Sequence, residues 1–345
     1  MLKLSVNNLE ELFSLINKEK TLYLPIEKDG PVQFGAWSPG ATARLDKLLT
    51  VKSPKEFFFP HIEDIATFKV SKKEISIKDE RSPITPFVVF GVRACDSRSL
   101  ELLDRVFLND PVDTFYEERR MNGLIITSAC FEPEETCFCT TFNIDALNCG
   151  ADITTWLFDD NLYWKAHSEK GRDLTEKLKY LFEQADSHDE KALKERQTRT
   201  KEIFNKLTFS DLSMEVFTPD RLLEVFNSPV WSSMYPSCLS CGTCTFICPT
   251  CHCYDIQDFN KGNEIQRFKC WDSCMYSDFT LMAHGNPRTS QMERFRQRYM
   301  HKLIYFPENN EGLFACAGCG RCVQKCPVLI NIVKVIKAFE VKENV

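Results

Sequence analysis

The chain has 345 residues, of which 43% are apolar, and a formal net charge of −6 at pH 7. This length and apolar content predict two or three domains with buried cores, and the negative charge argues against a nucleic-acid-binding face. No apolar stretch reaches the roughly 18 residues that a membrane-spanning helix needs, and no secretory segment follows Met1, so we expect a cytoplasmic protein that keeps its thiols reduced.

The first part of the chain, residues 1–170, is predicted to be a mixed α/β domain. A helix at 9–15 and a strand at 21–25 precede a continuous apolar run at 86–92, which is typical of a buried strand, and a further helix follows that run. A helix at 115–121 leads into a second buried strand at 124–127, and a hairpin at 156–164 closes the domain. The two buried strands end just before Cys95 and Cys130, at the edge where α/β sheets tend to place ligands.

Residues 171–228 are rich in Lys and Glu and are predicted to form a helical connector, and residues 229–345 a mainly α-helical, two-cluster ferredoxin-like domain. The predicted fold class is therefore α+β. Basic residues that include Arg298 and Lys302 alternate with apolar residues at helical spacing, which favours an amphipathic helix with a solvated basic side. The alternative is a basic face that docks an acidic partner.

Two copies of one cysteine spacing dominate the last part of the chain. Each reads C-x2-C-x2-C-x3-C-P, the run that wraps a cubane cluster in two-cluster ferredoxins, where the fourth cysteine of each run ligates the other run's cluster. We therefore predict two [4Fe–4S] clusters with crossed ligands: Cys238, Cys241, Cys244 and Cys326 for the first, and Cys316, Cys319, Cys322 and Cys248 for the second. Structural zinc usually draws its ligands from two separated C-x2-C pairs, so this spacing favours iron–sulfur chemistry.

Nine of the 17 cysteines lie outside the two runs. Cys95 and Cys130 each follow a predicted strand, and Cys137 and Cys139 come shortly after Cys130. If the two strands are neighbours, the four thiols converge, and they are a candidate third iron–sulfur cluster. The alternative is that they are small buried apolar residues. A second group, Cys251, Cys253 and Cys274, either ligates something or packs beside the clusters, and Cys149 and Cys270 are interpreted as core residues.

The chain resembles a family of iron–sulfur subunits that includes the sulfhydrogenase β subunit and the iron–sulfur electron-transfer subunit of anaerobic sulfite reductase. Further relatives of this family occur together with flavin oxidoreductases that are linked to heterodisulfide reductase. The matching stretches are 90–96, 135–139, 248–254, 271–274, 294–299 and 318–322, and the likeness runs from about Leu22 to Ile332. The resemblance implies a subunit of a multisubunit enzyme that passes electrons between a flavoprotein and a terminal redox module. It also implies cysteines at the third-cluster positions, whereas Cys270 has no counterpart.

The chain contains neither a G-x-G-x-x-G nor a G-x4-G-K-[ST] motif, so we expect no flavin or nucleotide on this chain alone. The resulting interpretation is a non-catalytic electron-transfer subunit of a hetero-oligomer in anaerobic metabolism. It would pass electrons between a flavoprotein diaphorase-type subunit and a catalytic module of the hydrogenase, sulfite reductase or heterodisulfide reductase type. The alternative is a sulfur-compound reductase whose own catalytic cluster lies in the amino-terminal domain.

Overall fold

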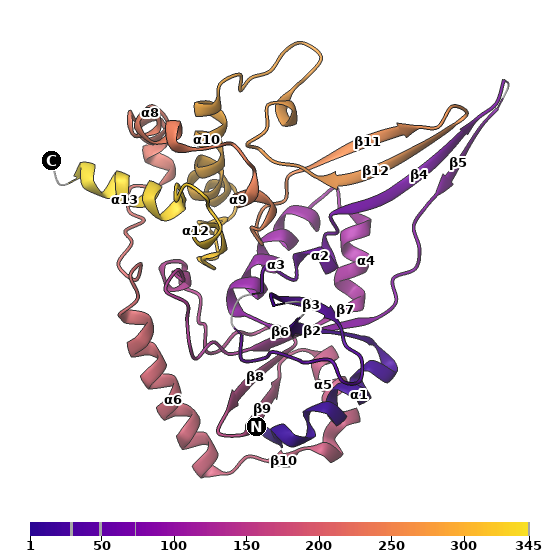
Figure 1. Ribbon diagram of the computed structural model, residues 1–345, viewed down its shortest axis with the longest axis vertical. Helices are drawn as coiled ribbons and strands as arrows, with labels where there is room; N and C mark the ends of the chain where they lie inside the picture. Colours follow the sequence, from indigo (N-terminus) through magenta and orange to yellow (C-terminus); the bar gives the residue numbers. More distant parts are fainter. Residues whose placement is uncertain (28–29, 48–49, 73, 344–345) are drawn as a thin grey trace.

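An eight-stranded mixed sheet organises the amino-terminal half of the computed structural model, which describes residues 1–27, 30–47, 50–72 and 74–343 (Figure 1). Its strands are β1 (Leu2–Ser5), β2 (Thr21–Glu27), β3 (Val32–Ala36), β6 (Phe87–Val92), β7 (Gly123–Ser128), β8 (Ile153–Phe158), β9 (Asn161–Ala166) and β10 (Glu183–Gln184). They are ordered β10-β1-β9-β8-β7-β6-β2-β3, and the four central strands β8, β7, β6 and β2 run parallel. The predicted apolar runs are thus neighbours in the buried centre of the sheet, as expected for parallel strands covered on both faces.

Helices cover both faces of this sheet. One face packs against α1 (Leu9–Glu19) and α5 (Glu169–Leu178), and the other against α2 (Lys55–Phe58), α3 (Ala94–Phe107) and α4 (Thr114–Asn122). Because β6 and β7 are parallel neighbours, their carboxyl ends meet at one edge of the sheet. That edge carries the start of α3 and the loop that follows β7.

A second sheet joins the two halves of the sequence. It contains β4 (Ile62–Val70) and β5 (Ile75–Asp79) from the amino-terminal half, and β11 (Tyr254–Asn260) and β12 (Glu264–Trp271) from the insertion between the two cysteine motifs. The strands are antiparallel in the order β11-β12-β4-β5, with Ile265 opposite Phe68, and they extend as an arm from the body of the molecule (Figure 1). The insertion therefore holds a β-hairpin as well as the helices expected around the clusters.

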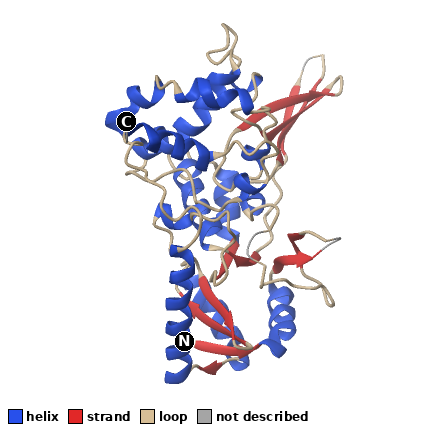
Figure 2. Cartoon of the chain, turned by 60° about the vertical axis from the view of Figure 1, so that its left-hand side comes forward, coloured by secondary structure: helices blue, strands red, loops and turns tan. Residues whose placement is uncertain are grey.

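The rest of the chain is mainly helical. The long helix α6 (Ser187–Asn205) runs along one side of the molecule between the sheet and the carboxy-terminal helices (Figure 2). Those helices are α7 (Leu222–Phe226), α8 (Val230–Met234), α9 (Thr243–Phe246), α10 (Gln291–Met300), α11 (Phe306–Asn309), α12 (Arg321–Gln324) and α13 (Ile332–Glu343), and a π-helical turn at His301–Tyr305 joins α10 to α11. Short 3-10 turns lie at Val6–Asn8, Cys139–Phe142, Lys179–Leu181, Pro219–Arg221, Tyr235–Ser237 and Asp278–Thr280.

Helix α10 corrects one expectation. Phe295, Tyr299 and, in the π-helical turn that follows, Leu303 belong to the core as the periodicity predicts. The predicted basic side is only partly solvated, because Arg294 and Arg296 are partly exposed whereas Arg298 and Lys302 are buried. Arg298 is only 2% exposed and Lys302 only 3%. Among the described residues, no helix combines the length and the apolar character required to span a bilayer.

Candidate iron–sulfur centres

One cavity, which we call the outer cavity, lies between the two cysteine motifs. Its lining includes Cys238, Cys241 and Cys244 from the first motif and Cys326 from the second. The chain turns at Gly242, whose φ of +73° and whose contact with Tyr276 leave no room for a side chain, since a Cβ would lie 2.4 Å from the Tyr276 hydroxyl. The four thiols that the crossed pattern groups together therefore share one cavity.

Polar groups in the outer cavity face its sulfur atoms. The Ser240 backbone N–H donates to Cys238 Sγ at 3.4 Å, and contact with the Thr243 hydroxyl lowers the pKa of the exposed Cys241 thiol. The buried Ser240 hydroxyl has no hydrogen-bond partner among the described residues. Such an unpartnered group is rare in a folded protein and fits a site that receives a polar, anionic occupant.

A second cavity, the inner cavity, contains the other four motif cysteines. Cys316, Cys319 and Cys322 line it together with Cys248 from the first motif. This cavity is more deeply buried, and burial raises the pKa of Cys316 to about 12. Binding of iron must therefore displace protons from these thiols, since the thiolate is the ligand.

Two buried cations, Arg298 and Lys302, line the inner cavity, whereas the sequence analysis assigned both to the solvated side of a helix. Arg298 lines the cavity and donates through Nη2 to the Cys244 carbonyl at 2.9 Å, while its Nε and Nη1 have no hydrogen-bond partner in the described parts of the chain. The Lys302 ammonium also lines the cavity and donates to the Thr250 hydroxyl (2.7 Å) and the Ala315 carbonyl (2.8 Å). A buried positive charge is costly without a negative partner, and an iron–sulfur cluster with thiolate ligands supplies one. Arg298 and Lys302, the buried part of the predicted basic side, thus lie where a bound cluster would compensate their charge.

Four further thiols converge at the edge of the large sheet, and we call them the amino-terminal cysteine group. Cys95 lies in the first turn of α3, Cys130 follows β7, and Cys137 and Cys139 lie in the next loop. Each is buried, with exposed fractions of 6–9%, and electrostatic interactions link Cys139 to Cys95, Cys130 and Cys137. Burial raises the pKa of Cys130 and of Cys137 to about 12. The structure thus brings together all four residues that the sequence grouped.

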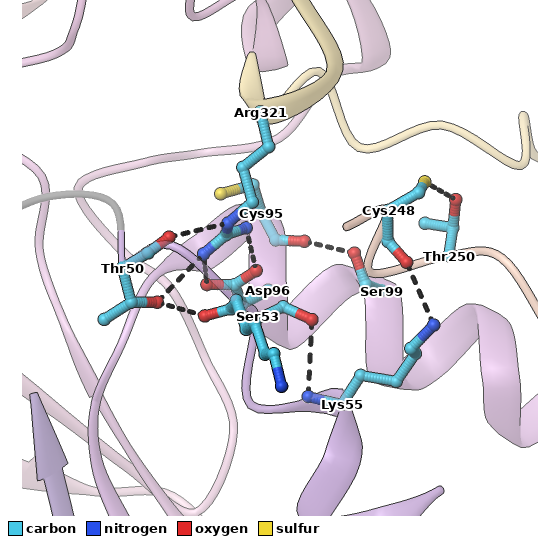
Figure 3. Close-up of polar contacts among 10 residues, drawn as sticks. Thr50, Ser53, Lys55, Cys95, Asp96, Ser99, Cys248, Thr250 and Arg321 are labelled. Atoms are coloured by element: carbon cyan, nitrogen blue, oxygen red, sulfur yellow. Dashed lines mark hydrogen bonds and ion pairs between the residues drawn. The ribbon is translucent and has the colours of Figure 1, made fainter. Parts of the chain in front are cut away.

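The amino-terminal cysteine group lies directly against the inner cavity. The Phe138 N–H donates to the Gly318 carbonyl at 2.9 Å, and Cys319 belongs to the same buried cluster as Cys95 and Cys139. An Arg321–Asp96 ion pair, with N–O distances of 2.6 and 2.9 Å and exposed fractions of 1–2%, ties the second motif to the start of α3 (Figure 3).

The remaining cysteines occupy two kinds of position. Cys251, Cys253 and Cys274 lie at the base of the β11–β12 hairpin, whereas Cys149 and Cys270 are half-buried outside the three groups. Cys149 contacts the Ser128 and Ala146 carbonyls. In the described parts of the chain, no three Cys, His, Asp or Glu side chains are arranged to hold a single metal ion. The spread of the motif thiols around cavities fits a multi-iron cluster better than one zinc ion.

Comparisons with known proteins agree with this chemistry. A family model described as a 4Fe-4S dicluster domain matches residues 237–330. The chain is 33% identical, over 344 residues, to a protein named sulfhydrogenase 2 subunit beta from Pyrococcus furiosus, and the alignment covers 99% of this chain and 98% of that protein. The chain belongs to the sulfhydrogenase β-subunit family. No solved structure matches it.

Membership of the sulfhydrogenase β-subunit family confirms the resemblance found in the sequence. Together with the dicluster domain, it makes the chain an iron–sulfur electron-transfer subunit of an oxidoreductase. The sequence motifs identified this class, but the local patterns indicated neither the burial of Arg298 and Lys302 nor the Arg321–Asp96 pair, because these contacts depend on segments that meet only in the folded chain.

Proposed function

We propose that the chain relays single electrons through three [4Fe–4S] clusters in series. The amino-terminal cysteine group would hold one, the inner cavity the next and the outer cavity the third. The observation that carries this order is the position of Cys319, a residue of the inner cavity that packs in one buried cluster with Cys95 and Cys139. Arg298, which lines the inner cavity, donates to the backbone carbonyl of Cys244, a residue that lines the outer cavity.

The chemistry supplied by bound clusters is one-electron transfer without bond making, so no proton-transferring side chain is required. The chain's own residues would fix the positions of the three clusters, shield them from solvent and set their reduction potentials. The loops that carry the thiols touch through the Phe138–Gly318 hydrogen bond, which keeps the spacing between the first two sites short. The outer cavity is the least covered, because Cys241 is exposed and Leu239 on its rim is 63% exposed. Electrons would leave or enter there.

We further propose that the chain works in a hetero-oligomer with a flavoprotein diaphorase-type subunit and a catalytic redox subunit. The relative from Pyrococcus furiosus is named as a subunit of a sulfhydrogenase, which supports this assignment. Direct reduction of a sulfur compound at the amino-terminal cysteine group is less well supported, because its four thiols are buried and a substrate would have to reach them through packed side chains.

The test removes one cysteine ligand from the middle site, the inner cavity. In the complex purified anaerobically with its partner subunits, Cys322→Ser is expected to slow electron passage from the flavoprotein donor to the terminal acceptor at least about tenfold, since one cluster in a series cannot be bypassed. The measurement is the steady-state donor-to-acceptor rate, together with the electron paramagnetic resonance spectrum of the reduced complex.

Cys149→Ser is the matched control, because it changes a half-buried thiol outside the three groups. The control should retain the parent rate. A Cys322→Ser complex that transfers electrons as fast as the parent, with its amino-terminal half folded, would rule out the series arrangement.

A further inference from the structure

Exposed apolar side chains lie at the mouth of the outer cavity. Leu239 and Val328 line the cavity and are 63% and 37% exposed, and Leu329, next to Val328, is 59% exposed. Tyr276 adjoins them, because its hydroxyl donates to the Cys241 carbonyl at 3.2 Å, and it is 36% exposed. We call these four residues the outer rim. Cys241, the exposed cysteine of the outer cavity, belongs to the same lining.

The backbone of the outer rim adopts unfavourable conformations. Leu329 has a φ of +55°, and Ser240, which lies between Leu239 and Cys241, has a φ of +52°. The left-handed region is sterically unfavourable for a residue with a Cβ. At Leu329 this backbone also holds a large apolar side chain in water, which is unfavourable in its own right. Strained backbone of this kind is concentrated at functional sites, and a partner that buried the Leu329 side chain would offset these costs.

The outer rim is built mainly from uncharged parts of the chain. Residues 227–254 and 326–333 contain no Asp, Glu, Lys or Arg, although these four residue types make up 27% of the sequence. A surface that receives a diffusible redox carrier benefits from charge, because complementary charge speeds the encounter. The core of a lasting subunit interface is instead depleted of charged residues and rich in apolar ones. The composition of the rim therefore favours a subunit that stays bound.

We propose that the outer rim is the docking face for a permanently bound redox subunit that exchanges electrons with the cluster of the outer cavity. This inference rests on the proposed relay and adds the place and the chemistry of the contact. The facing surface of the partner would be apolar and uncharged, with a redox cofactor directly behind it. Docking would also exclude water from Cys241, and solvent exposure is one of the factors that set the potential of a cluster.

Charge placed on the outer rim tests this docking face in the complex purified anaerobically with its partner subunits. Leu239→Glu/Leu329→Glu changes two side chains that are more than half exposed, and glutamate carries a Cβ as leucine does. Because a charge buried in an apolar interface is costly, the double variant is expected to bind one redox subunit at least about 100-fold more weakly. The measurement is the release of that subunit on dilution, followed by analytical ultracentrifugation. The donor-to-acceptor rate should fall at least about tenfold with the release, since the relay then lacks one neighbour.

Leu223→Glu is the matched control, because Leu223 is an exposed leucine (71%) on α7 that does not line the outer cavity. The control should keep all subunits and the parent rate. If the double variant fails to fold or loses iron, Leu329→Glu alone decides the question by the same two measurements, since Leu329 does not itself line the cavity.

Three outcomes would overturn the proposal. One is a Leu329→Glu complex that keeps every subunit and the parent rate. Another is a rate that falls steeply with added salt while the subunits stay together, which indicates a diffusible carrier. The third is the release of a second copy of this chain in place of a different subunit. The docking face can fail in these ways while Cys322→Ser still blocks electron passage, whereas parent-like passage in Cys322→Ser would contradict the relay itself.

Discussion

At the scale of single residues, Arg298 is the side chain whose environment the sequence indicates least. The spacing of the basic and apolar residues around it correctly predicts a helix, but periodicity reports only which residues could share a face. It does not report what lies against that face. Arg298 is buried beside the thiol-lined inner cavity, and an anionic occupant of that cavity would compensate a charge that is otherwise costly to bury.

Replacing Arg298 with methionine tests this electrostatic role. A positive charge beside a cluster favours its reduced, more negative state, so Arg298→Met is expected to lower the midpoint potential of the inner-cavity cluster by roughly 60 mV or more, about a tenfold change in a one-electron equilibrium. The measurement is a redox titration followed by electron paramagnetic resonance.

Arg296→Met provides the control on the same helix, because Arg296 stacks on Phe226 and bonds its carbonyl instead of lining a cavity. The midpoint potentials of the clusters in the Arg296→Met variant should equal those in the parent. Identical potentials in Arg298→Met and the parent would show that the guanidinium does not tune the cluster.

At the scale of elements, the contact between two cysteine loops depends on Gly320. This residue has a φ of +76°, and a Cβ at this position would lie 2.6 Å from the Thr136 carbonyl oxygen. Because the neighbouring atom is backbone, it cannot move aside easily. A side chain here would push the amino-terminal cysteine group away from the inner cavity.

Gly320→Ala is therefore expected to destabilise the chain by more than the about 1–3 kcal/mol that a left-handed backbone costs a residue with a Cβ. Gly262→Ala isolates the backbone cost, since Gly262 has a φ of +90° but no atom within 4 Å of its Cβ position. Urea unfolding of both variants gives the comparison. Equal losses of unfolding free energy would mean that the two loops are not in close contact.

The elements themselves were predictable to different degrees. The buried strands at 86–92 and 124–127 and the hairpin at 156–164 follow from local apolar patterns, and the structure confirms them as β6, β7 and the β8–β9 pair. The pairing of β12 with β4 was not foreseen. Ile265 and Phe68 are opposite each other although they are far apart in the sequence, and no local pattern specifies such a partner.

At the scale of the whole molecule, the amino-terminal cysteine group is the part of the relay that rests least on a known motif. The double variant Cys137→Ser/Cys139→Ser is expected to lose about four irons per chain, one cubane cluster, while the ferredoxin-type signals remain. Iron analysis and electron paramagnetic resonance of the anaerobically purified chain provide the measurement. Cys149→Ser, which changes a nearby thiol outside the group, should lose none.

Unchanged iron content in the double variant would leave only two clusters and shorten the relay to the carboxy-terminal part. The sequence could suggest this group because Cys95 and Cys130 each follow a predicted strand, and the structure shows that these two strands, β6 and β7, are neighbours. It could not reveal that Cys319 packs beside them, since that contact forms only when the second motif folds back onto the start of α3.

The sheet that combines β4 and β5 with β11 and β12 has a consequence for how such a protein can be inherited. A gene that encoded only the last third of the chain would produce β12 with one bare edge, and an exposed edge strand invites pairing with foreign chains. Recombination that split the coding sequence between these strands would therefore yield two aggregation-prone products. Joining both halves in a single polypeptide therefore keeps the edge of β12 covered by β4.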